Sequence, residues 1–200
     1  MEASSKGIEL RGIEVFRYLP THSHADHSTG IVEAMKTGID IYLLPETREA
    51  LGLSGHRIHE IKLLHQFTIG NFAIKAFPVK HDVPNCGFLL ANKEGERAVY
   101  ITDTQYCPYR FENLHTIAIG CNFSEEIIKE NVASGETDRY LKRRVMHAHM
   151  SLESLLEMLK ANDLSKVREI WLLHGSSSNL DKEEAKRQVQ EATGVPVYVA

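Results

Sequence analysis

Four side chains that can bind a metal ion lie within six residues of one another near the start of the chain. They are His22, His24, Asp26 and His27 in the segment Thr21–His27, which follows an apolar stretch. Alternate side chains of an extended segment point to the same side, so His22 and His24 should face one way. A turn into a following helix would bring Asp26 and His27 beside them. Imidazole and carboxylate groups suit zinc and similar ions, which favours a metal site over a solvated histidine-rich turn.

Three more candidate ligands lie far along the chain, each at the end of an apolar run of strand character. His81 follows one such run, Asp103 closes Tyr100–Asp103, and His174 closes Trp171–His174. Taken singly, each has an ordinary interpretation as a strand-end, turn or cap residue. Their occurrence together, in this order and always at a strand end, matches the remaining motifs of a known family, and that resemblance implies that they join the first cluster.

In this order the motifs resemble the signature of the metallo-β-lactamase superfamily, over roughly residues 13–200. The resemblance implies a hydrolase with two divalent metal ions, zinc first, with manganese or iron as alternatives. It assigns one ion to His22, His24 and His81, the other to Asp26, His27 and His174, and a bridging position to Asp103. Two such ions lower the pKa of a shared water from about 15.7 towards ~7, giving a bridging hydroxide that Asp26 would orient.

Three shorter patterns resemble the phage-encoded and YycJ (WalJ)-like branch of the superfamily, which is also similar to ribonuclease Z. These are His174-Gly-Ser-Ser-Ser-Asn179, His149-Met-Ser-Leu-Glu153 and Gly120-Cys-Asn122. The branch implies hydrolysis of phosphodiester bonds in nucleic acid. It also implies a catalytic His149 that donates a proton to the leaving group or stabilises the reacting phosphate.

The sequence departs from the superfamily pattern in two places. Several strands usually precede the histidine motif, but only 21 residues precede His22 here, and relatives tend to carry an acidic residue where Gly120 stands. Missing leading strands predict an unpaired strand edge near Ile13–Leu19, and with it a homodimer, a fragment of a longer chain or marginal stability.

Length and composition are those of an ordinary globular chain, expected to form one domain over residues 1–200. Apolar residues make up 42% and charged residues 25%. No apolar run approaches the ~18 residues of a membrane span, and no secretory signal is visible.

Cys86, Cys107 and Cys121 are scattered and odd in number, which predicts reduced thiols and a cytoplasmic protein. The net charge of −4 argues against a surface coated with basic residues for nucleic acid but allows a local basic patch.

The pattern of elements predicts a layered α/β or α+β domain. The resemblance implies an α+β fold, an αββα-type two-sheet sandwich with flanking helices that lacks its N-terminal strands. Hairpins are expected at Gly70-Asn71 and Glu94-Gly95, with short strands before Asp103 and His174. Helices are expected at 28–36, 46–51, 124–132, 138–146, 151–160 and from Asp181 to Gly194.

The remaining histidines and the one cluster of cationic residues are not assigned to the metal site. His56, His59, His65, His115 and His147 are not expected to bind metal. The run Arg139, Lys142, Arg143, Arg144 is either a solvated helix face or the counter-charge that a phosphodiester substrate needs.

Two alternatives to a nuclease stay open, because the motif specifies metal binding and leaves the substrate undefined. One is a hydrolase of a small thioester, lactam or cyclic phosphodiester. The other is a metal-binding protein without turnover.

Overall fold

The computed structural model describes residues 17–135 and 138–200. In these ranges the elements follow the order β1 (Arg17–Tyr18), α1 (Ala25–Ser28), α2 (Ile31–Lys36), β2 (Asp40–Leu43), α3 (Pro45–Ala50), β3 (Ile58–Glu60), β4 (Gln66–Ile69), β5 (Phe72–Pro78), β6 (Cys86–Ala91), β7 (Arg97–Ile101), β8 (Thr116–Gly120), α4 (Glu125–Ala133), α5 (Arg139–Ala148), α6 (Leu152–Lys160), β9 (Glu169–Leu173), α7 (Lys182–Thr193) and β10 (Val197–Val199). The expected hairpins are present. The helix expected at 28–36 corresponds to α2, which begins at Ile31, and the short α1 precedes it and includes Ser28.

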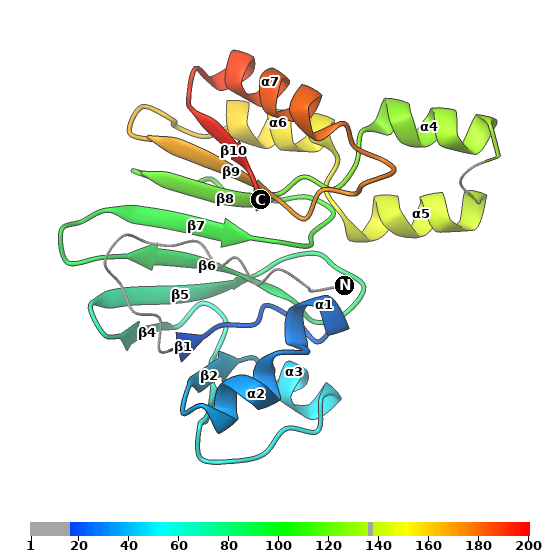
Figure 1. The fold of residues 1–200 in the computed structure, drawn as a ribbon. Helices are drawn as coiled ribbons and strands as arrows, with labels where there is room; N and C mark the ends of the chain where they lie inside the picture. The colour runs from blue at the N-terminus through cyan, green and yellow to red at the C-terminus, as the bar shows by residue number, and fades with distance from the viewer. Residues whose placement is uncertain (1–16, 136–137) are drawn as a thin grey trace.

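The larger sheet has seven strands in the order β10-β9-β8-β7-β6-β5-β4 (Figure 1). Strands β4 to β7 pair antiparallel, whereas β7, β8, β9 and β10 pair parallel. The carboxyl ends of parallel strands meet at one edge of a sheet, which is where open α/β sheets hold their ligands. The loops after β7, β8 and β9 therefore share one edge.

Helices α6 and α7 cover one face of this sheet (Figure 1). Leu155 and Leu159 of α6 and Val189 of α7 are almost fully buried against strand residues such as Ile117 and Ile170. The leucines of α6 recur at helical spacing, which places them on one face. Ser151 caps this helix by accepting a hydrogen bond from the Ser154 amide. This layer forms the main core.

The smaller sheet has the order β1-β2-β3, with all strands parallel. On one side Ile41 and Leu43 pack against Ile31 of α2. On the other side Leu44 and Ile61 lie in one apolar cluster with residues of β5 and β6. The layers thus run helix, sheet, sheet, helix, and the expected α+β fold with two sheets and flanking helices is confirmed.

The strand predicted near the N-terminus lies only partly within the residues that the structure describes. Of the predicted strand Ile13–Leu19, residues 17 and 18 form β1, at the edge of the smaller sheet, and residues 13–16 lie outside the described ranges. Within those ranges, no helix is long and apolar enough to span a bilayer.

Candidate metal centre

The histidine loop after β1 is anchored to the larger sheet. The Thr21 carbonyl accepts a hydrogen bond from the Cys86 amide at 3.2 Å. The Thr21 hydroxyl lies 2.9 Å from Nδ1 of His22 and 3.1 Å from the hydroxyl of Thr102, at the end of β7. With Nδ1 engaged in this way, Nε2 of the fully buried His22 ring is the nitrogen that faces the cluster.

One group of candidate ligands consists of His22, His24, His81 and Asp103, whose ligand atoms all lie within 4.8 Å of one another. Nε2 of His81 lies 3.2 Å from Nδ1 of His24, and Nε2 of His22 lies 3.6 Å from Oδ2 of Asp103. The other nitrogen of His81, Nδ1, donates to the Ala148 carbonyl at 2.7 Å. A neighbouring carbonyl thus holds this ring with Nε2 towards its group.

The second group consists of Asp26, His27, His174 and Asp103. Nε2 of His174 lies 3.1 Å from Nε2 of His27 and 2.9 Å from Oδ2 of Asp26, and Nε2 of His27 lies 3.1 Å from Oδ2 of Asp103. Ligands about 2.0–2.1 Å from a tetrahedral ion are about 3.3 Å apart. The spacing in both groups is that of atoms arranged around an ion.

Asp103 belongs to both groups through the same oxygen, Oδ2. Within the described residues, Nε2 of His22, Oδ1 of Asp103 and Nδ1 of His149 are buried polar atoms with no hydrogen-bond partner. Leaving such atoms unsatisfied costs about 1–3 kcal/mol each. A pair of divalent cations between these groups would supply the missing partner for His22 and charge compensation for Asp103, so the donor set fits the dinuclear centre that the sequence implies.

The protonation states of His22 and Asp103 suit metal binding, whereas the direction of the pKa shift of His27 opposes it. Burial lowers the pKa of His22 to about 3, so the imidazole is neutral at pH 7. Burial would raise the pKa of Asp103, yet the imidazoles of His149 and His27 hold it well below its ordinary value. Burial opposes a charge on His27, but Asp103 and then Asp26 outweigh this effect and raise its pKa. Neutral imidazole and ionised carboxylate are the forms that bind metal.

His149 reaches the cluster from the C-terminal end of α5. Its Nδ1 lies 3.5 Å from Oδ1 of Asp103, and its ring stacks on that of His174 with centroids 5.8 Å apart. The rest of the His149–Glu153 pattern is structural, because Ser151 caps α6 and the Glu153 carboxylate accepts from the Glu125 amide. Within this segment, His149 is the residue whose side chain contacts the candidate ligands.

The last ligand position carries backbone strain. His174 has a φ of 57°, in the left-handed region that residues other than glycine rarely adopt. The side chain of Asn122 supports this turn by donating to the His174 carbonyl at 2.9 Å. Strain held by neighbouring groups is typical of functional positions.

Comparison with models of protein families identifies the family to which the chain belongs. The model of the beta-lactamase superfamily domain matches residues 17–174, most of the chain and all seven candidate ligands. The chain belongs to this superfamily. One protein that shares the fold, Igni18 from the archaeon Ignicoccus hospitalis, is described as a metallo hydrolase. No curated protein matches the chain.

Solved structures of low sequence identity share the fold. The metallo-β-lactamase fold protein YhfI from Bacillus subtilis has a TM-score of 0.64 at 15% identity, over 92% of this chain and 74% of YhfI. The CmlA β-hydroxylase, from Streptomyces venezuelae, has a TM-score of 0.61 at 16% identity, over 92% of this chain and 42% of CmlA. The short form of human tRNase Z has a TM-score of 0.58 at 16% identity, over 94% of this chain and 78% of the enzyme.

The structure brings together all seven metal ligands predicted from the sequence, and it places His149 beside them. The other five histidines belong to neither ligand group. His59 stacks on Tyr42, and exposed His147 lies 3.5 Å from the side-chain nitrogen of Gln105.

Sequence reasoning missed three polar residues at the centre. Oδ1 of Asp82 lies 3.1 Å from Nε2 of His81 and 3.4 Å from Nε2 of His24. Asn85 donates to the backbone carbonyl of Asp103, and Asn122 supports His174. Asp82 directly follows the predicted ligand His81, and this position in the sequence could have identified it as a candidate. Asn122 stands in the pattern Gly120-Cys-Asn122 but was assigned no role, and nothing local in the sequence distinguishes Asn85 from a turn residue.

The structure explains why position 120 holds a glycine and not the acidic residue that relatives tend to carry. A Cβ at this position would collide with the backbone carbonyl of Thr102. The ends of β7 and β8 therefore approach too closely for an acidic side chain here.

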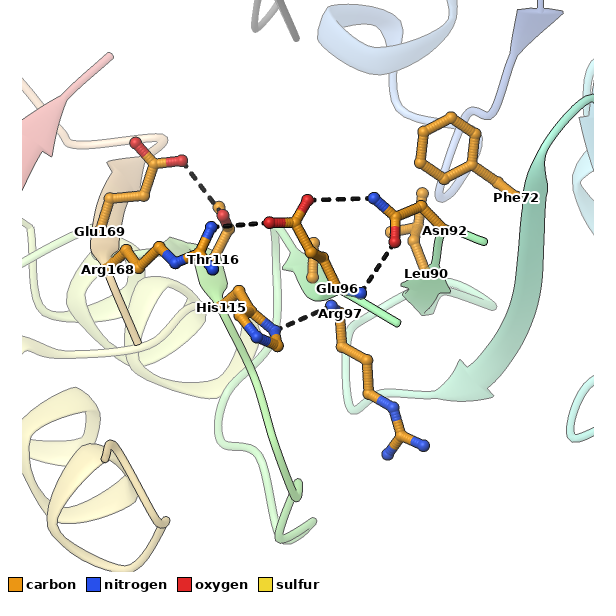
Figure 2. Close-up of a pocket in the computed structure, with 10 residues that line it drawn as sticks. Phe72, Leu90, Asn92, Glu96, Arg97, His115, Thr116, Arg168 and Glu169 are labelled. Carbon is orange, nitrogen blue, oxygen red and sulfur yellow. Dashed lines mark hydrogen bonds and ion pairs between the residues drawn. The ribbon is translucent and has the colours of Figure 1, made fainter. Parts of the chain in front are cut away.

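A separate pocket of about 490 Å³ lies at the opposite, amino-terminal edge of β7, β8 and β9 (Figure 2). Within it, Arg168 forms an ion pair with Glu96 at 2.6 Å, and the Thr116 hydroxyl donates to Glu169 at 3.1 Å. No candidate metal ligand lines this pocket, so the chemistry lies at the other edge of the sheet.

Proposed function

We propose that this protein is a dinuclear metal-dependent hydrolase that cleaves phosphodiester bonds of nucleic acid. The observation that carries the proposal is the presence of two ligand groups joined by Asp103, with buried donor atoms left unsatisfied between them. His22, His24 and His81 would hold one ion, and Asp26, His27 and His174 the other. Zinc fits this set of imidazoles and carboxylates.

Two ions held by these residues would supply a hydroxide nucleophile at neutral pH and would neutralise charge on the phosphate oxygens. The protein orients the reactants. The Asp26 side chain is 58% exposed, whereas His22 is fully buried, so substrate approaches from the Asp26 side. The His174 hydrogen bond keeps Asp26 ionised by opposing the effect of burial, so that its pKa is lowered. An ionised Asp26 can accept a proton from attacking water.

His149 is the candidate proton donor to the leaving oxygen. Its ring lies against both groups, through stacking on His174 and an edge contact with His81 at 5.5 Å between centroids. Its side chain is 21% exposed, so it borders the open side of the centre. A general acid at this position can protonate an alkoxide as the ester bond breaks.

Nucleic acid is proposed as substrate on two grounds. The fold is shared with human tRNase Z, and α5, which carries three described cationic side chains, ends at the metal centre. The proposed place in the YycJ-like branch has support in the H-x-S-x-x-N segment, where the Ser176 hydroxyl accepts hydrogen bonds from the Asn179 amide and orders the loop after His174.

One panel of assays separates this proposal from its alternatives. The protein is loaded with zinc, manganese or iron and assayed on bis(p-nitrophenyl) phosphate, an oligonucleotide, a thioester and a β-lactam. Turnover of phosphodiesters by the zinc form is expected. Turnover of the thioester or lactam alone would favour a small-molecule hydrolase, and two bound ions with no turnover would favour a non-catalytic metal-binding protein.

Iron has a specific reason to be in the panel. CmlA, which shares the fold, is described as a diiron β-hydroxylase. Metal content of the protein as isolated, measured by mass spectrometry, tests the zinc proposal. Iron in excess of zinc, with activity restored by iron alone, would contradict it.

A further inference from the structure

Helices α4 and α5 stand out from the end of the larger sheet as a pair (Figure 1). On α5, Tyr140, Arg144 and His147 are spaced at i, i+4 and i+7, and Arg143 lies between them. Residues at this spacing share one side of a helix. All four are exposed, and Tyr140 and Leu141 are 78% and 43% exposed. We call Tyr140, Arg143, Arg144 and His147 the α5 face.

The α5 face is not an ordinary solvated helix surface. On α7, exposed Arg187 pairs with Glu184 and Glu191 at 2.6 Å and 2.7 Å, which is the usual pattern. Helix α5 contains no acidic residue, and no ion pair among the described residues involves Lys142, Arg143 or Arg144. These cations are concentrated on one helix of a chain whose net charge is −4. Such a patch attracts a polyanion.

The α5 face leads to the metal centre. At its C-terminal end His147 lies 3.5 Å from Gln105, two residues after Asp103. The next residue, Ala148, accepts a hydrogen bond from His81, and His149 contacts Asp103. From Tyr140 to His147 a helix rises about 10 Å. A chain lying along the α5 face therefore reaches the candidate ligands directly.

From this arrangement we infer that the α5 face binds single-stranded nucleic acid and guides it to the metal centre, with Tyr140 stacking on a base. The inference rests on the proposed function. Arg143 and Arg144 supply charge for the phosphates. A tyrosine ring this exposed offers a flat surface to an unpaired base, whose faces are covered in a duplex.

The test is binding of a short fluorescent phosphorothioate oligothymidylate to the zinc-loaded protein of 200 residues, measured by fluorescence anisotropy. Phosphorothioate linkages slow hydrolysis, so affinity is read separately from turnover. Tyr140→Ala should weaken binding about 5- to 100-fold, and Tyr140→Phe should retain it. The double variant Arg143→Ala/Arg144→Ala should reduce the slope of log K against log salt by about 1.4, or about 0.7 for each phosphate that the protein no longer neutralises.

Matched controls lie away from the α5 face. Tyr198 on β10 is 44% exposed, and the Arg168 side chain at the far pocket (Figure 2) is 67% exposed. Tyr198→Ala and Arg168→Ala should bind the oligonucleotide as the wild type does. If Tyr140→Ala also binds as the wild type, or if a duplex binds equally well with the same dependence on Tyr140, the inference is wrong.

Two further outcomes separate this inference from the proposed function. Capture by phosphatidylserine vesicles that depends on Tyr140, without oligonucleotide binding, would overturn the inference in favour of a membrane surface. Hydrolysis of bis(p-nitrophenyl) phosphate without oligonucleotide binding would overturn the inference alone. Oligonucleotide binding through Tyr140 without hydrolysis of any ester would overturn the proposed function and support the α5 face.

Discussion

Burial of His22 should make the metal-free protein sensitive to mild acid. Folding lowers the pKa of this imidazole from 6.5 to about 3, whereas the unfolded chain binds a proton near pH 6.5. Between these values the unfolded state holds more protons than the folded state, so stability falls as pH falls through this window. Each pH unit is worth about 1.4 kcal/mol, which gives a loss of about 2 kcal/mol between pH 6.5 and 5.0 from His22 alone.

Neighbouring groups also contribute to the total dependence of stability on pH. The lowered pKa of His81 acts in the same direction as that of His22. The raised pKa of His27 acts in the opposite direction, since its stabilisation is complete below pH 6.5 and is lost as pH rises through the folded value. The variant His22→Asn removes one titrating group and leaves the others.

The assay is urea unfolding of the chelator-treated protein at several pH values between 7 and 5, followed by circular dichroism. The wild type should lose about 2 kcal/mol more than His22→Asn over pH 6.5 to 5.0. Exposed His65, replaced by asparagine, serves as the control and should leave the wild-type slope. Parallel slopes for the wild type and His22→Asn, or an NMR titration of His22 centred near pH 6.5, would refute the argument from burial.

Replacing Asp103 by asparagine should lower the zinc content per chain, measured by mass spectrometry, because both ligand groups share its Oδ2; two retained ions would exclude sharing. His149→Ala should keep the zinc content and reduce kcat about 10²- to 10⁴-fold, and an unchanged kcat would remove it from catalysis. Gly120→Ala should cost about 1–3 kcal/mol in urea unfolding, because its Cβ meets the Thr102 carbonyl, whereas Gly30→Ala faces open space; equal stability would argue against that close contact. A second copy pairing with the edge strand β1 should appear as a dimer in light scattering, and a monomer at all concentrations would contradict it.

The sequence alone identified the candidate ligands because the information is local. His22, His24, Asp26 and His27 are adjacent in the chain, and His81, Asp103 and His174 each follow an apolar run, so type and position in a strand were visible without coordinates. The helix boundaries were also local, since Ser151 caps α6 and Gly194 ends α7 in the left-handed conformation. Short-range hydrogen bonds and periodicity determine such features.

Other features depended on contacts between segments far apart in the chain. The parallel register of β7, β8 and β9 carries Asp103 and His174 to one edge, 71 positions apart in sequence. The collision that requires Gly120, the support of His174 by Asn122 and the approach of α5 to His81 arise in the same way. The sequence around each of these groups does not show its partner, because strand pairing and helix packing determine which residues meet. Only the tertiary structure shows that the basic helix ends at the metal centre, whereas a helical pattern by itself gives the face of a helix and not its direction in space.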